Sequence, residues 1–153
     1  MTLDRSAGLT ESARALAAGE VTSRALVEQA LARIEATQGT VNAFRVVRTR
    51  AALAEADAAD KELAAGVRAP LLGVPVAVKD DMDVAGEPTA FGCEGEFPPV
   101  TEDGEAVQRG WVARGRVLGQ TNTHRDRAGA VLRRAAPREA HHPLKRHPTT
   151  RRA

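Results

Sequence analysis

A short apolar run that ends on a lysine constrains this chain more than any other feature. Residues 74–78 read VPVAV, which is short and β-branched enough to predict a strand rather than a helix. Lys79 follows the run directly, and aspartates occupy positions 80, 81 and 83. The chain therefore places one amine at the end of a predicted strand, with several carboxylates close by in the sequence.

The segments around this strand alternate between helical and extended patterns. The second helical segment carries an apolar stripe at three- and four-residue spacing, formed by Leu26, Ala30 and Ile34. Helices alternating with strands favour an α/β fold. The expected elements are helices over 11–18 and 23–37, capped by Thr10 and Thr22 with Gly19 and Gly39 beyond their ends, a short strand or turn over 41–47, an alanine-rich helix over 48–65 ended by Gly66, the strand 74–78, a helix near 104–114 with Trp111 in the core, and a brief strand over 116–119.

Composition limits the class of protein. With 153 residues and 42% hydrophobic residues, the chain is long enough for one domain with a moderate core. No stretch approaches 18 consecutive apolar residues and the N-terminus lacks an apolar signal region, so we expect neither a membrane span nor a secretory signal. The lone Cys93 excludes an intramolecular disulfide and is expected to be an ordinary small side chain in a cytoplasmic protein.

The last 29 residues differ in kind from the rest. Residues 1–124 carry a net charge of −5, whereas residues 125–153 carry +7 and are rich in arginine, proline and histidine. We expect 125–153 to be disordered, or a frayed helix near 127–136. Without interleaved aromatic residues, the tail is expected to be solvated rather than to bind nucleic acid. Its histidines have no cysteine or acid at ligand spacing, so no metal site is expected at His141, His142 or His147.

Two roles are open for Lys79. An ion pair with Asp80, Asp81 or Asp83 would make it a neutralised strand-end charge, which is common. Alternatively it is a general base, because an apolar surrounding penalises the charged form of an amine and a neutral amine can take a proton from a hydroxyl. The nearby carboxylates act against the second role by favouring the ammonium.

A family resemblance favours the second role. The segment GVPVAVKDDMDVAGEPTAFG (73–92), the upstream residues 9–44 and the downstream GRVLGQTNTH (115–124) resemble the amidase signature family. The resemblance implies an α/β fold with helices packed on a partial mixed sheet, a Ser–cis-Ser–Lys triad, a small-molecule amide substrate and no cofactor or metal. Lys79 is similar in position to the family's catalytic lysine, which deprotonates a bridging serine that activates the nucleophilic serine.

The two serines of that triad have no counterpart in this sequence. In the family they lie in a Gly-Gly-Ser-Ser-Gly-Gly stretch, whereas the serines here are Ser6, Ser12 and Ser23, none beside a glycine pair. Residues 1–124 are therefore interpreted as a partial amidase domain that is inactive alone. The resemblance ends near His124, and our hypothesis is that residues 125–153 are read out of frame and that the chain stops early.

Three functions follow from these observations. The first is an amidase that hydrolyses an amide C–N bond. The second is a fragment like the amidase-type subunit of a glutamyl- or aspartyl-tRNA amidotransferase, and the third is a non-catalytic fragment that self-associates through exposed core surface. Three positions depart from the family pattern and bear on packing or substrate fit: Asp81 replaces a frequent asparagine, Arg116 a small residue, and Gln120 a lysine.

Overall fold

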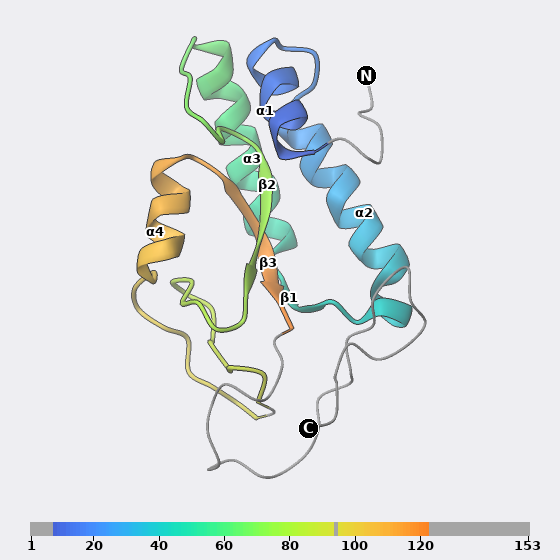
Figure 1. The fold of residues 1–153 in the computed structure, drawn as a ribbon, viewed down its shortest axis with the longest axis vertical. Coiled ribbons are helices and arrows are strands. Elements are labelled where there is room, and N and C mark those ends of the chain that lie inside the picture. The colour runs from blue at the N-terminus through green and yellow to red at the C-terminus, as the bar shows by residue number, and fades with distance from the viewer. Residues whose placement is uncertain (1–7, 94, 123–153) are drawn as a thin grey trace.

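Helices and strands alternate along the chain in the computed structural model, which describes residues 8–93 and 95–122 (Figure 1). This part of the chain forms an α/β fold, as predicted. The elements are α1 (Leu9–Ala17), α2 (Ser23–Val41), β1 (Phe44–Val47), α3 (Thr49–Ala64), β2 (Pro75–Lys79), α4 (Glu105–Val112) and β3 (Arg116–Thr121). The tail 125–153 and its expected frayed helix lie outside the described residues.

The three strands form a small mixed sheet in the order β1-β3-β2. β1 runs antiparallel to the central β3, whereas β2 runs parallel to it. A parallel pair needs a crossover, and the segment between β2 and β3, which contains α4, supplies it. Because the two parallel strands end at the same edge of the sheet, Lys79 lies beside Thr121 in the register.

Small residues allow the helices to pack closely on this sheet. α2 and α3 contact one another, α3 packs on β3 and α2 on β2 (Figure 1). Leu118 of β3 is buried between Val27 of α2 and the alanines 52 and 56 of α3. A second cluster joins α1 to the residue before β2 through Leu16 and Val74. Alanine at the helix contacts is consistent with a core that has few aromatic residues.

The helix ends agree only in part with the sequence patterns. Thr22 caps α2 as predicted, since its Oγ1 accepts a hydrogen bond from the Ala25 backbone N–H at 3.1 Å. The Thr10 prediction is wrong, because α1 already begins at Leu9 after Gly8. α2 also runs through Gly39 and ends at Asn42, which takes the left-handed conformation with φ 49°. Asparagine tolerates that conformation, whereas a glycine inside a helix costs only about 1 kcal/mol.

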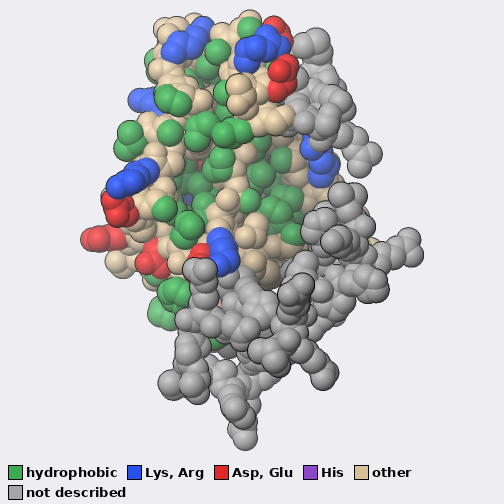
Figure 2. Space-filling model, viewed as in Figure 1, with side chains coloured by type: hydrophobic (Ala, Val, Ile, Leu, Met, Phe, Trp, Pro, Cys, Tyr) green, Lys and Arg blue, Asp and Glu red, His purple; other side chains and the backbone are tan. Residues whose placement is uncertain are grey.

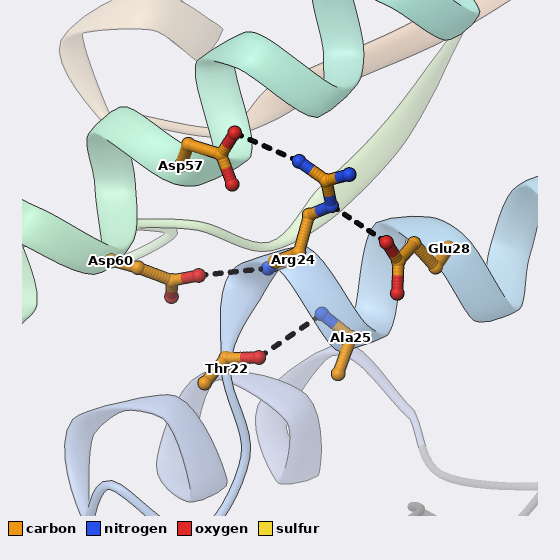
Figure 3. A network of polar contacts seen from close by, with 6 residues as sticks. All are labelled: Thr22, Arg24, Ala25, Glu28, Asp57 and Asp60. Atoms are coloured by element: carbon orange, nitrogen blue, oxygen red, sulfur yellow. Dashed lines mark hydrogen bonds and ion pairs between the residues drawn. The ribbon is translucent and has the colours of Figure 1, made fainter.

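A carboxylate of α3 ties down the first turn of α2 (Figure 3). Asp60 accepts hydrogen bonds from the backbone N–H groups of Ser23 at 2.6 Å and Arg24 at 3.0 Å, which have no partner within the helix. The Arg24 guanidinium bonds Glu28 at 2.6 Å and Asp57 at 2.8 Å, and these two bonds raise the pKa of Arg24. The two helices are thereby fixed to one another at the end nearest to the loop that leads into β2.

That loop is held by the same turn of α2. Ser23 is fully buried, and its Oγ donates a hydrogen bond to the Gly73 carbonyl oxygen at 2.7 Å. Gly73 has φ +81°, a conformation that favours glycine. The position of β2, and therefore of Lys79 at its end, depends on this contact between sequence-distant residues.

Candidate functional site

Lys79 is the last residue of β2 and faces solvent in part. Its side chain is 40% exposed, and its Nζ lies 2.8 Å from Asp81 Oδ2. A turn brings the two together, because the Met82 backbone N–H donates to the Lys79 carbonyl oxygen at 3.0 Å. Of the three aspartates that the sequence left open as partners, Asp81 is therefore the one paired with the amine.

The neighbouring Asp80 has a different environment. It is fully buried, and its carboxylate accepts hydrogen bonds from the backbone N–H groups of Ala90 at 3.1 Å and Gly92 at 3.2 Å. The guanidinium of Arg45, on β1, lies 3.5 Å from the same carboxylate. Asp80 is thus committed to the loop that follows β2 and does not pair with Lys79.

Two arginines that sequence reasoning missed hold the turn-rich segment 85–92. Arg45 donates to the Pro88 carbonyl oxygen at 3.1 Å, and Arg48 lies 3.4 Å from Glu87 and 3.1 Å from Glu55. Arg48 is also 6.0 Å from the centre of the Trp111 ring. Trp111 is only partly buried, so its placement in the core was wrong: its ring covers an arginine at the edge of the core instead. The only sequence signal for these contacts is that both arginines border the strand 44–47.

The three positions that depart from the family pattern all make contacts close to the sheet. Asp81 pairs with Lys79, as described above. Gln120 is fully buried, and its amide nitrogen lies 3.3 Å from the Met82 carbonyl oxygen. Arg116 is nearly buried and lies 3.9 Å from Glu62 of α3. Polar side chains at these positions therefore act in the local packing around β3 and the turn after β2.

The serines within the described residues do not approach Lys79 through any hydrogen bond of the structure. Ser12 lies on α1, and Ser23 is buried at the start of α2 with its hydroxyl bonded to Gly73. Ser6 lies outside the described residues, as do the histidines 141, 142 and 147. Cys93 is partly buried, and its sulfur lies 4.0 Å from the Phe91 carbonyl oxygen. The site therefore presents an amine with a carboxylate partner rather than a complete nucleophilic triad.

Candidate metal ligands are scattered over the described part of the chain. Across residues 8–93 and 95–122, no three histidine, cysteine, aspartate or glutamate side chains are grouped as metal ligands would be. Within the same ranges, no helix has both the length and the apolar character that a membrane crossing requires.

Comparison with known proteins places this geometry in a family. A family model described as Amidase matches residues 25–149, a range that continues beyond residue 124, so the boundary at 124 stays a prediction. The protein named as amidase AmiA2 in Mycobacterium tuberculosis is 55% identical over 115 residues, which are 75% of this chain and 24% of that protein. The amidase-type (A) subunit of the glutamyl-tRNA(Gln) amidotransferase of Anaeromyxobacter sp. (strain K) is 40% identical over 140 residues, 89% of this chain and 28% of that protein.

Solved structures agree with these relatives. A crystal structure of an amidase is 41% identical with a TM-score of 0.70, and covers 76% of this chain with 27% of its own. The native peptide amidase of Stenotrophomonas maltophilia is 30% identical with a TM-score of 0.71, and covers 77% of this chain with 25% of its own. The chain thus spans about a quarter of the length of the relatives it matches. On the family match over residues 25–149 and these likenesses, the chain belongs to the amidase family.

Proposed function

We propose that this chain supplies the lysine-bearing part of an enzyme that hydrolyses amide C–N bonds, with Lys79 as the general base. The observation that carries the proposal is the place of the amine. Lys79 ends β2 beside the end of the parallel strand β3, and ligands of open α/β sheets bind outside the carboxyl ends of such strands. Membership of the amidase family and the resemblance of segment 73–92 to the family's lysine motif support the assignment.

The proposed chemistry needs the amine in its neutral form. The neutral amine takes a proton from a serine hydroxyl, directly or through a second serine, and the serine oxygen forms a bond to the amide carbon. The C–N bond then breaks, the nitrogen leaves with a proton, and water hydrolyses the acyl-enzyme to the acid. The aspartate at position 81 holds the ammonium in place and must release it before each proton transfer.

Residues 1–153 alone are proposed to be inactive. None of the three serines lies in a glycine-rich stretch, and Ser23 is buried away from solvent with its hydroxyl already bonded. Loss of the nucleophile from a triad leaves only a small remainder of catalysis. Purified 1–153 should therefore release no 4-nitroaniline from 4-nitroacetanilide above the buffer rate, and Lys79→Ala should change nothing.

A chimera tests the base directly. Residues 1–122 would replace the matching segment of the related AmiA2 protein, once an amide that the unmodified AmiA2 hydrolyses has been found. We expect the chimera to hydrolyse this amide, Lys79→Ala to abolish turnover, and Lys61→Ala to leave it intact, because Lys61 lies on the exposed side of α3. An active chimera that keeps its turnover with Lys79→Ala would refute the role of Lys79.

A role as part of a tRNA amidotransferase is the second candidate. The observation in its favour is the 40% identity to the amidase-type subunit of a glutamyl-tRNA(Gln) amidotransferase over 89% of this chain. A chimera built on that relative should then hydrolyse glutamine and pass ammonia to a glutamyl-tRNA in the presence of the other amidotransferase subunits. Glutamine hydrolysis in that chimera, without hydrolysis of simple amides in the AmiA2 chimera, would favour this alternative.

The third candidate is a non-catalytic fragment that self-associates in the cytoplasm. Apolar side chains gather across the middle of the face shown in Figure 2, where β2 runs in Figure 1, and this supports association through that face. Light scattering coupled to gel filtration should show the apparent mass of 1–153 rising with concentration. A constant monomer mass of 16.2 kDa over the whole concentration range would contradict it.

A further inference from the structure

Three successive backbone N–H groups converge on Asp80. Ala90 donates to one carboxylate oxygen, Gly92 to the other, and the Phe91 N–H between them donates to the Asp80 backbone carbonyl at 3.0 Å. Successive N–H groups in a turn form a concavity that binds anions, and here the anion is a side chain of the same protein. One residue therefore fixes the course of the loop 90–92.

This attachment also spans the sheet. Asp80 follows β2, whereas its counter-ion Arg45 lies on β1, and β3 runs between these two strands. The same guanidinium bonds the Pro88 carbonyl oxygen. Burying an ionised carboxylate costs free energy unless hydrogen bonds and an opposite charge offset it, and both are present at this position. The pair joins two strands and the loop in one buried contact.

Asp80 occupies the position between the two members of the Lys79–Asp81 pair. Its own backbone N–H donates to the Thr121 carbonyl oxygen at 3.0 Å, so its backbone is bonded to β3 on one side and to Phe91 on the other. The separation of Lys79 from Asp81, 2.8 Å between Nζ and Oδ2, depends on the backbone angles of the residue between them. A change that frees Asp80 therefore frees the direction of both side chains.

Phe91 shows how firmly the loop is held. It has φ +53°, which is unfavourable for a bulky residue, and its side chain is 48% exposed, so burial of the ring does not account for this conformation. The two flanking hydrogen bonds to the Asp80 carboxylate do account for it.

We propose that Asp80, with Arg45 as its counter-ion, is a positioning residue that holds the Lys79 amine and the loop 90–92 in a fixed relation. The proposal rests on the assignment of Lys79 as the base. It predicts that Asp80 acts on Lys79 only through the backbone, since neither the carboxylate nor Arg45 bonds the amine among the described contacts.

Asp80→Asn in the full 153-residue chain tests this. The asparagine side chain keeps the shape but can no longer accept from both N–H groups. Amide hydrogen exchange at Ala90 and Gly92, measured by NMR, should accelerate about tenfold, the equivalent of one lost hydrogen bond each. Asp103→Asn is the matched control, because Asp103 also accepts a loop N–H, from Ala85 at 2.7 Å, and should change exchange only there.

A second readout separates positioning from general stabilisation. Brief treatment with acetic anhydride, followed by mass spectrometry, gives the acetylation ratio of Lys79 to Lys61, which is exposed on α3. Release of the Lys79–Asp81 pair should raise this ratio about two- to fivefold, the range expected for an exposed ion pair. Arg45→Gln should raise it in the same direction and Arg45→Lys should restore it. These arginine variants decide the question if Asp80→Asn does not fold.

The proposal is overturned if folded Asp80→Asn, or folded Arg45→Gln, keeps the wild-type acetylation ratio. It is also overturned if exchange accelerates equally in α2 and in the loop, because Asp80 would then only stabilise the fold as a whole. Neither readout requires turnover. An inactive chimera therefore refutes the assigned base without touching the positioning result, and an unchanged ratio refutes the positioning without touching the base.

Discussion

Replacing Gly73 by alanine tests how tightly the approach to β2 is built. The left-handed φ of +81° disfavours any residue with a Cβ, at about 1–2 kcal/mol. A Cβ at this position would also lie 2.9 Å from the Ser23 Cβ and 3.0 Å from its Oγ. Ser23 has little freedom to move, because it is fully buried and bonded to the Gly73 carbonyl oxygen.

The expected loss of stability follows from three contributions. Backbone strain costs about 1–2 kcal/mol, and the stiffer unfolded chain returns about 0.4–1 kcal/mol. Overpacking against Ser23 adds about 1–3 kcal/mol. The free energy of unfolding should therefore fall by about 1–4 kcal/mol, and each kcal/mol lowers the melting temperature of a domain of this size by about 4–8 °C.

Gly86→Ala provides the matched control. Gly86 has nearly the same backbone conformation, φ +83°, but no atom within 4 Å of the position of a Cβ. It should show only the backbone contribution, so urea unfolding followed by circular dichroism should find Gly73→Ala less stable than Gly86→Ala by about 1–3 kcal/mol. Equal midpoints for the two variants would refute the claim that Ser23 limits the space at Gly73.

Three further predictions use the same unfolding measurements. Asp60→Ala should lower the free energy of unfolding by about 1–3 kcal/mol, because two backbone N–H groups of α2 lose their acceptor; an unchanged midpoint would contradict this. Phe91→Gly should raise it by up to about 1 kcal/mol, since relief of the left-handed strain exceeds the entropy cost of glycine; a clear loss would show that the phenyl ring is needed. The hydrogen bonds from Arg14 lower the pKa of Glu20, so the stabilisation by this pair is complete above the ordinary carboxyl value of 4.5 and is lost as the pH falls through the lowered pKa. The melting temperatures of wild type and Arg14→Ala should therefore converge in acid and at about 1 M salt, where screening is strong, and a constant difference would argue against the pair.

The arrangement of helices and strands was predictable because it depends on local periodicity. The apolar stripe of α2 and the β-branched run 74–78 each select one type of element regardless of their neighbours. The ends of the elements were less predictable, since they depend on tertiary contacts. α2 passes Gly39 and stops at Asn42, where the Gln38 side chain accepts a hydrogen bond from the Phe44 N–H at 3.1 Å. That bond exists only because β1 starts there.

Lys79 itself was predictable from sequence as a candidate base, through its place after the strand and the resemblance of its segment. Its supporting residues were not, because the contacts that define them join distant parts of the chain. Arg45 and Arg48 act on residues 87 and 88, and Asp60 acts on the start of α2. A lone arginine or aspartate in a sequence carries no signal of a partner on another element.

The opposite environments of Asp80 and Asp81 show where local reasoning stops. Alternation along an extended chain places residues 79 and 81 on one side and residue 80 on the other, so the pairing of Lys79 with Asp81 was within reach of the sequence. Alternation does not say which side is buried. The burial of Asp80 depends on Arg45, which β1 brings across the sheet, and on the amides of 90 and 92, which the following loop brings back. With the other side buried, Lys79 would have lost its solvent-facing position, so the tertiary contact of Asp80 determines whether the amine at the end of β2 can meet a substrate.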